Sequence, residues 1–160
     1  MTTVLPAKPL TQNAVAGLAD VIEATGAPDK LINQNLCGRF HDRATLDIEG
    51  RTGISVFQSK AFSLPFSLEM VERHPLGSQA FLPMYQGDYL VVLADDEGGA
   101  PGVPMAFIAG AGQGVNIRRG VWHGVLCPLS APGLFAVVDR VSDGVNLEEH
   151  RFETPYVIKG

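Results

Sequence analysis

The side chains best suited to acid–base or metal chemistry begin at Glu72 and His74. The two residues are separated by one position, so in an extended strand both side chains point to the same face. Pro75 and Gly77 are expected to bend or end that strand, because proline lacks a ladder donor and glycine frees the backbone. Gln79 lies on the next strand, and we expect it to join the same group.

A second candidate histidine follows about fifty residues later. His123 stands next to Trp122, the only tryptophan, at the entry to an apolar segment. Two imidazoles, a carboxylate and a carboxamide offer nitrogen and oxygen donors without a thiolate, which suits a first-row divalent ion better than a structural zinc. We therefore take His74, His123, Glu72 and Gln79 as candidate metal ligands, and Glu72, His74 and His123 as candidate catalytic residues. Metal-free acid–base catalysis and ordinary buried core histidines are the alternatives that stay open.

The elements that must position these residues are mainly strands. From Leu31 onward, apolar runs of four to eight residues alternate with turn clusters, which predicts about ten strands in a sandwich or barrel. Residues 11–24 place Val15, Leu18 and Ile22 at helical spacing behind Thr11, so we expect a short N-terminal helix there. The acidic, glycine-rich residues 95–102 predict an exposed hairpin turn. The last apolar segment is expected to form a strand that is free to pair with a partner subunit.

Length and composition narrow the class of protein. The 160 residues have a net charge of −5 and are 46% hydrophobic, which predicts one compact domain over residues 1–160. There is no run of lysine or arginine, so nucleic acid is not an expected partner. No apolar stretch approaches the length of a membrane span and no secretory leader is recognised, so we expect no membrane association and a cytoplasmic location. Cys37 and Cys127 are expected to be buried and unpaired.

Two motifs around the candidate residues resemble those of the cupin superfamily. Its first motif reads H-x-H-x(3,4)-E-x(6)-G, and this chain has Glu72-x-His74-x(4)-Gln79-x(7)-Gly87. Its second reads G-x(5)-P-x-G-x(2)-H, and the counterpart here is Gly112-x(5)-Arg118-x-Gly120-x(2)-His123. The resemblance implies a mainly β fold, a double-stranded β-helix or jelly-roll barrel. The substitutions at Glu72, Gln79 and Arg118 affect metal binding more than they affect the fold.

Three strings together are similar to the ureidoglycolate lyase family, formerly called ureidoglycolate hydrolase. They are ERHPLGSQAFLPM, GVNIRRGVWH and GRFHD. The resemblance implies cleavage of ureidoglycolate to glyoxylate and urea in allantoin and purine degradation. It also implies a homodimer that acts on a small molecule with a divalent metal, nickel being the first choice. The alternatives are an amidohydrolase that releases ammonia and carbon dioxide, and a non-catalytic cupin that binds a small carboxylate.

The implied substrate carries a carboxylate, which a guanidinium can bind with two parallel hydrogen bonds. Arg118 is favoured as that anchor because it occupies a motif position, whereas strand alternation places Arg73 on the opposite side from Glu72 and His74. Arg140 is a further candidate. The remaining candidate substrate-binding residues are Gln79 and three residues of a polar segment that can reach a site in the same or a neighbouring subunit: Asn33, Arg39 and His41.

Overall fold

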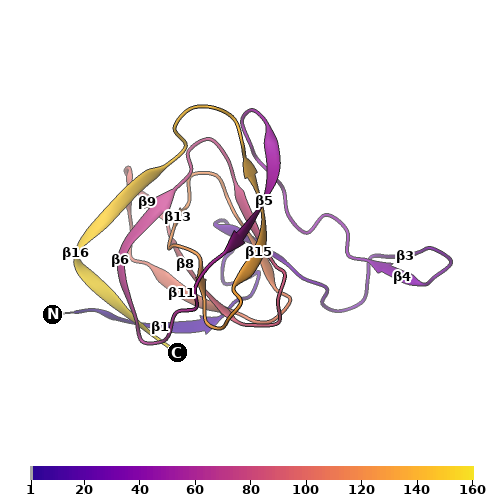
Figure 1. The fold of residues 1–160 in the computed structure, drawn as a ribbon, viewed down its shortest axis with the longest axis horizontal. Helices are drawn as coiled ribbons and strands as arrows, with labels where there is room; N and C mark the ends of the chain where they lie inside the picture. Colours follow the sequence, from indigo (N-terminus) through magenta and orange to yellow (C-terminus); the bar gives the residue numbers. More distant parts are fainter. Residues whose placement is uncertain (1) are drawn as a thin grey trace.

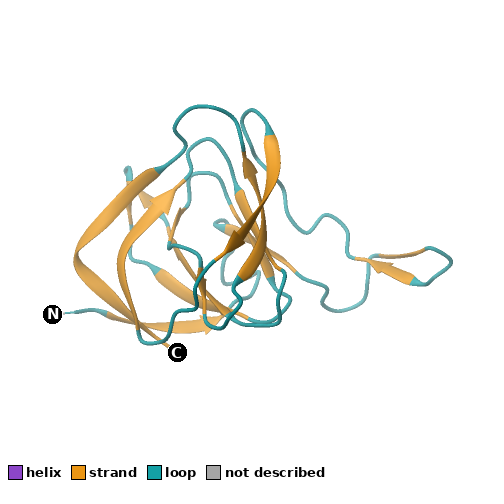
Figure 2. Cartoon of the chain, viewed as in Figure 1, coloured by secondary structure: helices purple, strands orange, loops and turns teal. Residues whose placement is uncertain are grey.

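The first sheet is closed into a barrel. The computed structural model describes residues 2–160, and within that range it contains strands, turns and loops but no helix (Figures 1 and 2). The sheet order is β11-β1-β16-β6-β13-β8-β14, and an additional pairing of β11 with β8 closes the ring. Its strands are β1 (Val4–Pro9), β6 (Phe66–Arg73), β8 (Tyr89–Ala94), β11 (Met105–Ala109), β13 (Trp122–His123), β14 (Cys127–Pro128) and β16 (Glu148–Lys159).

A second, five-stranded sheet has the order β2-β12-β7-β15-β5 and packs against the face of β8 and β11 that carries Val91, Leu93 and Phe107. Its strands are β2 (Ala19–Ile22), β5 (Thr52–Gln58), β7 (Gln79–Pro83), β12 (Gly114–Ile117) and β15 (Leu134–Arg140). The antiparallel register places Phe81 opposite both Val115 and Val137, and all three side chains are buried. Because successive side chains of a strand point to opposite faces, Phe81, Val115 and Val137 lie on one apolar face of this sheet, which packs into the core.

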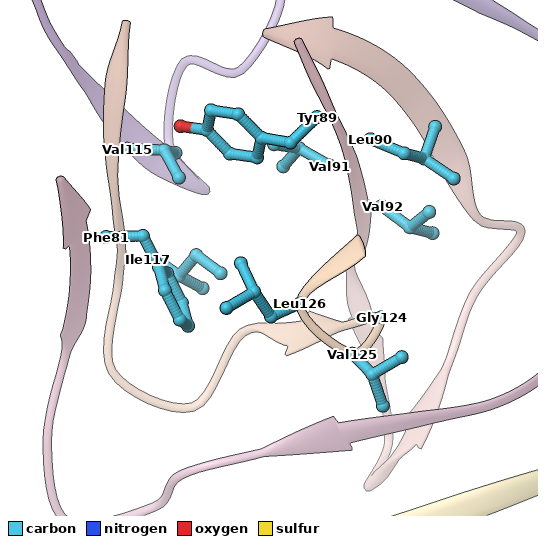
Figure 3. Close-up of a pocket in the computed structure, with 10 residues that line it drawn as sticks. All are labelled: Phe81, Tyr89, Leu90, Val91, Val92, Val115, Ile117, Gly124, Val125 and Leu126. Atoms are coloured by element: carbon cyan, nitrogen blue, oxygen red, sulfur yellow. The ribbon is translucent and has the colours of Figure 1, made fainter. Parts of the chain in front are cut away.

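The core between the two sheets is well filled. Phe135 is fully buried and makes edge contacts with the rings of Phe81, Tyr85 and Tyr89. Figure 3 shows the small apolar cavity that remains beside Tyr89. Its volume of about 20 Å³ holds about one water molecule, so no substrate can bind there.

Two short hairpins lie outside these sheets. Strands β9 (Asp96–Glu97) and β10 (Ala100–Pro101) form the acidic, glycine-rich hairpin that the sequence predicts. Strands β3 (Lys30–Ile32) and β4 (Cys37–Arg39) form another that projects well away from the barrel (Figure 1).

The predicted N-terminal helix over residues 11–24 is wrong. Residues 12–18 form turns and the chain then enters β2, which pairs with β12. Thr11 does accept hydrogen bonds from Ala14 and Val15, as expected at a helix start. Gly17, however, adopts a φ of +85°, which ends the helical path after about one turn. Pairing of β2 within the sheet overrides the weak helical period.

The expectation for the cysteines is wrong in part. Cys127 is buried as predicted, but Cys37 is exposed because it lies on the projecting hairpin. The last strand, β16, pairs with β6 along most of its length and with β1 only at Val157, Ile158 and Lys159, so its pairing with a partner subunit stays a prediction. The first strand, β1, likewise pairs on both sides, with β11 and β16.

Candidate active site

The two predicted histidines and Glu72 come together at one end of the barrel. Strand β13 pairs with β6 so that His123 lies directly opposite Glu72. His74 follows the end of β6, and its ring lies 5.1 Å from that of His123, centroid to centroid. One ligand atom from each of the three residues lies within 4.8 Å of the others. The structure thus brings together three of the four predicted metal ligands as one cluster.

Backbone carbonyls orient both imidazoles. Nδ1 of His74 is 2.7 Å from the carbonyl oxygen of Asn146, and Nδ1 of His123 is 2.9 Å from that of Gly124. A carbonyl can only accept, so each Nδ1 must carry a proton and donate it. In the neutral rings the lone pairs are therefore on Nε2, and both Nε2 atoms are buried without a hydrogen-bond partner. Two such orphaned acceptors beside a carboxylate are typical of a ligand set.

Burial shifts the pKa values of His123 and Glu72 in opposite directions. His123 is only 2% exposed, and burial, with a smaller contribution from nearby His74, lowers its pKa to about 4. Burial also raises the pKa of the Glu72 carboxyl, against an opposing attraction from His74. Oε1 of Glu72 is 3.9 Å from Nε2 of His74, and their side chains keep 22% and 18% exposure. The site therefore holds a neutral imidazole and a carboxylate with increased basicity, both properties of acid–base sites.

The low pKa of His123 predicts an acid-sensitive fold. Its pKa of about 4 is below the unfolded value of about 6.5, so the unfolded chain binds the extra proton between these values. The stability that neutral His123 contributes is complete above pH 6.5 and is lost as the pH falls toward 4. For metal-free protein we expect the unfolding free energy to fall by about 1–2 kcal/mol more between pH 7 and pH 5 than in His123→Asn.

Urea unfolding at the two pH values measures this difference. Glu72 has the opposite effect, because a carboxyl with a raised pKa stabilises the folded state as the pH falls. Glu72 is present in both proteins, so the comparison between them isolates the effect of His123. An equal pH dependence in wild type and His123→Asn would contradict the assignment of a depressed pKa to His123.

Gln79, the fourth predicted ligand, lies at the start of β7. Its amide nitrogen donates to the carboxylate of Asp139 at 3.0 Å, while its amide oxygen is buried without a partner. Gln79 is thus oriented by Asp139, a role that sequence reasoning missed. Asn146 was missed as well: its carbonyl holds His74 and its side-chain oxygen accepts from the backbone of Leu76. Gln79 and Asp139 each lie next to a residue of the Ala80–Val138 pair on neighbouring strands, so their contact becomes visible only once the strand pairing is known.

Arg118 does not point to this cluster. Its guanidinium donates to Asp20 at 2.9 Å in a groove on the outer side of the second sheet, of about 460 Å³, which is also lined by Thr45 and Ser78. Although burial opposes it, hydrogen bonds from Arg118, Asn116 and the backbone of Thr45 lower the pKa of Asp20. The ion pair keeps Asp20 charged and occupies part of the arginine's hydrogen-bonding capacity.

Arg73 lies on the other side of β6 from Glu72, as strand alternation predicts. It forms ion pairs with Asp96 at 2.7 Å and Glu148 at 2.6 Å, and it stacks on Trp122. Asn33 and Arg39 are on the projecting hairpin, and His41 follows it; all three are exposed. The backbone of His41 donates to Asp29, and this segment is remote from the histidine cluster of the same chain (Figure 1).

Comparison with known proteins decides the family. A family model described as ureidoglycolate lyase matches residues 2–159. A protein of Rhodobacter capsulatus named ureidoglycolate lyase is 52% identical over 155 residues, 96% of each chain. One of Rhizobium meliloti named ureidoglycolate lyase 2 is 49% identical over 97% of each chain, and one of Mesorhizobium japonicum named ureidoglycolate lyase is 46% identical over 98% of each.

The chain belongs to the ureidoglycolate lyase family. Two of the three sequence strings that resemble this family surround the histidine cluster, and the third, GRFHD, lies at the projecting hairpin. The closed barrel agrees with the cupin-like fold expected for the family. Within residues 2–160 there is no helix long and apolar enough to cross a membrane.

The cluster also fits the divalent metal that the family resemblance implies. Nε2 of His74 and Nε2 of His123 are buried without partners, and the Glu72 carboxylate lies within reach of both. The amide oxygen of Gln79, the fourth predicted ligand, is likewise buried without a partner. Imidazole nitrogen and carbonyl or carboxylate oxygen suit first-row divalent ions, so a member of the ureidoglycolate lyase family can hold such an ion here.

Proposed function

We propose that this chain is a ureidoglycolate lyase, which cleaves ureidoglycolate to glyoxylate and urea. The observation that carries the proposal is the cluster of Glu72, His74 and His123 in a chain of this family. The substrate's central carbon bears a hydroxyl, a carboxylate and a ureido nitrogen. Cleavage removes the hydroxyl proton, forms the aldehyde C=O bond, breaks the C–N bond and places a proton on the departing nitrogen.

Glu72 is the group proposed to move the proton. Burial raises the pKa of its carboxyl, which brings it closer to working pH and makes the carboxylate a better base. The hydroxyl and the ureido nitrogen are bonded to the same carbon, so one carboxyl can accept the proton from oxygen and return it to nitrogen. The imidazole of His74 is the polar group beside that carboxyl, with its Nε2 3.9 Å from Oε1 of Glu72.

We further propose that His74 and His123 hold a divalent ion through Nε2, with the Gln79 amide oxygen as an additional ligand and nickel as the first candidate. When bound, the ion would lower the pKa of the substrate hydroxyl, as metal ions do for bound water. The carbonyls of Asn146 and Gly124 fix the tautomer in which both Nε2 atoms can serve as ligands.

Turnover of racemic ureidoglycolate before and after exhaustive chelation tests this function. We expect urea and glyoxylate in equal amounts, loss of activity on chelation, and recovery with one divalent ion. Release of ammonia and carbon dioxide would instead identify an amidohydrolase. Saturable glyoxylate binding without turnover would identify a binding protein. Full activity in protein shown by elemental analysis to be metal-free would overturn the metal assignment and leave the lyase.

Three further features complete the proposal. The family match over residues 2–159 supports a single domain over residues 1–160. We propose a homodimer, for which light scattering is the test. A cytoplasmic location is proposed from the composition of the chain, and fractionation of the source cells tests it.

A further inference from the structure

Within residues 2–160, no strand outside the β3–β4 hairpin pairs with it. Its two strands pair only with each other. Leu31 is 52% exposed and Leu36 is 86% exposed, two large apolar side chains on a short element. A two-stranded hairpin alone is marginal in water, so this one requires a surface to pack against. Figure 1 shows that the surface is not provided by the barrel from which it projects.

The charges of the hairpin point to an acidic surface. Lys30 and Arg39 lie directly opposite each other in its register, a destabilising arrangement of like charges. Residues 30–41 contain these two cations and no acidic residue, whereas the whole chain has a net charge of −5. Within residues 2–160 neither cation forms an ion pair. The rest of a second copy, which is acidic, therefore has the complementary charge.

Apart from the proposed metal ion, the candidate active site has no free arginine for the substrate carboxylate among residues 2–160. Glu72 lies in the cluster, and Asp139 holds Gln79 at the start of β7. The arginines of the neighbouring strands and turns are engaged elsewhere by ion pairs or backbone carbonyls: Arg51, Arg73, Arg118, Arg119 and Arg140. A substrate carboxylate beside the Glu72 carboxylate is stabilised by a guanidinium, and this set of arginines offers none that is free.

We propose that two copies of the chain exchange their β3–β4 hairpins, and that Arg39 of each copy binds the substrate carboxylate in the active site of the other. This inference rests on the proposed function. A two-fold dimer gives each hairpin a surface to pack against and gives each active site an arginine, because each copy donates its Arg39 to the other. Arg39 is the cation at the C-terminal end of β4; it is exposed, and it forms no ion pair in the part of the chain that the structure describes.

Exposed apolar residues on the body support a second copy as the occupant. Ile54 and Val56 on β5 are 76% and 64% exposed, and β5 pairs only with β15. Val145, beside the Asn146 that orients His74, is 85% exposed. These residues offer the apolar contact area that Leu31 and Leu36 lack in their own chain. The hairpin leaves the body on the side that carries β5 (Figure 1).

Complementation between two inactive chains tests the exchange. Arg39→Ala is expected to lower kcat/KM for ureidoglycolate by roughly 10–100-fold, mainly through KM, because a charge-assisted hydrogen-bond pair is lost. Arg39→Lys is expected to restore only part of this loss. A heterodimer of R39A with H74A, isolated by two different affinity tags, then has one complete site. We expect about half of the wild-type rate per dimer.

The matched control places both substitutions on one chain. A heterodimer of the R39A/H74A double variant with wild type has no complete site under the exchange, and we expect it to show no more than the R39A level. If Arg39 acts within its own chain, the outcomes of the two heterodimers reverse, which overturns the proposal. Wild-type kcat/KM in R39A, or a monomer by light scattering, overturns it too.

Cross-linking tests the docking without any turnover. Cys37 is exposed on the same strand as Arg39 and two residues away, so both side chains point to one face. With a short bismaleimide, V145C should form a covalent dimer through Cys37, whereas V103C, at a position that is also exposed, and V145C/C37S should not. Absence of the V145C product overturns the proposal. If the wild-type protein fails to cleave ureidoglycolate, the proposed function is wrong. The cross-linked V145C dimer then still tests the docking of the hairpin, because its formation requires no turnover.

Discussion

Replacing His74 by alanine is expected to lower kcat for ureidoglycolate cleavage by about 10²–10⁴-fold. The substitution removes the Nε2 atom that faces Glu72 and His123, and with it one of the three groups of the cluster. It also leaves the carbonyl of Asn146 without its donor, which costs about 1–3 kcal/mol of stability. The measurement is steady-state production of urea and glyoxylate, at substrate concentrations that separate kcat from KM.

His150→Ala is the matched control for the loss of an imidazole. His150 packs against Trp122 and Phe152 and takes no part in the cluster. We expect its kcat to stay close to wild type. Urea unfolding of both variants separates a chemical defect from an unfolded protein. A folded His74→Ala variant with normal kcat would remove His74 from the reaction.

Replacing Phe135 by alanine is expected to reduce the free energy of unfolding by about 3–5 kcal/mol. Its side chain is completely buried and three aromatic rings contact it, so the deleted atoms leave a cavity that the sheets cannot close. This is a large part of the roughly 5–15 kcal/mol by which domains are stable. Denaturant unfolding with an unchanged m-value measures the loss.

Two comparison variants define the size of this effect. Phe135→Leu keeps most of the side-chain volume and should lose much less stability. Val103→Ala, at a position that is 67% exposed, should change stability by no more than about 0.5 kcal/mol. A loss in Phe135→Ala no larger than that of Val103→Ala would show that the ring is not part of the stabilising core.

The all-β barrel could be predicted from the sequence because its evidence is local and repeated. Short apolar runs separated by glycine and proline recur along the chain, and the motif residues Gly112 and Gly120 both adopt the positive φ that glycine favours. The helix over residues 11–24 could not be rejected in the same way. Its apolar spacing fits a helix locally, and only the pairing of β2 with β12 excludes one.

The part of the candidate site that depends on side-chain alternation along a strand could be predicted from the sequence. The part that depends on backbone atoms far away in the sequence could not. Residues Glu72 and His74 share a face because they are two positions apart, and Arg73 lies on the other side for the same reason. The carbonyl of Asn146 is 72 residues from the imidazole it holds, and a backbone atom leaves no signal in residue type. The ion pair of Arg118 with Asp20 could not be predicted, because the position of Arg118 in the motif does not reveal it.

The place of β16 in the barrel has a consequence for how the chain must fold during synthesis. The C-terminal end of β16 lies between β1 and β6, and Val4 pairs with Val157 across nearly the whole length of the sequence. The ring therefore cannot close while residue 157 is still inside the ribosome, and β1 and β6 each expose an unpaired edge until then. Such non-local pairing slows folding, and open edges invite association with other chains. A nascent chain of this protein is thus most vulnerable to aggregation just before its last strand is released.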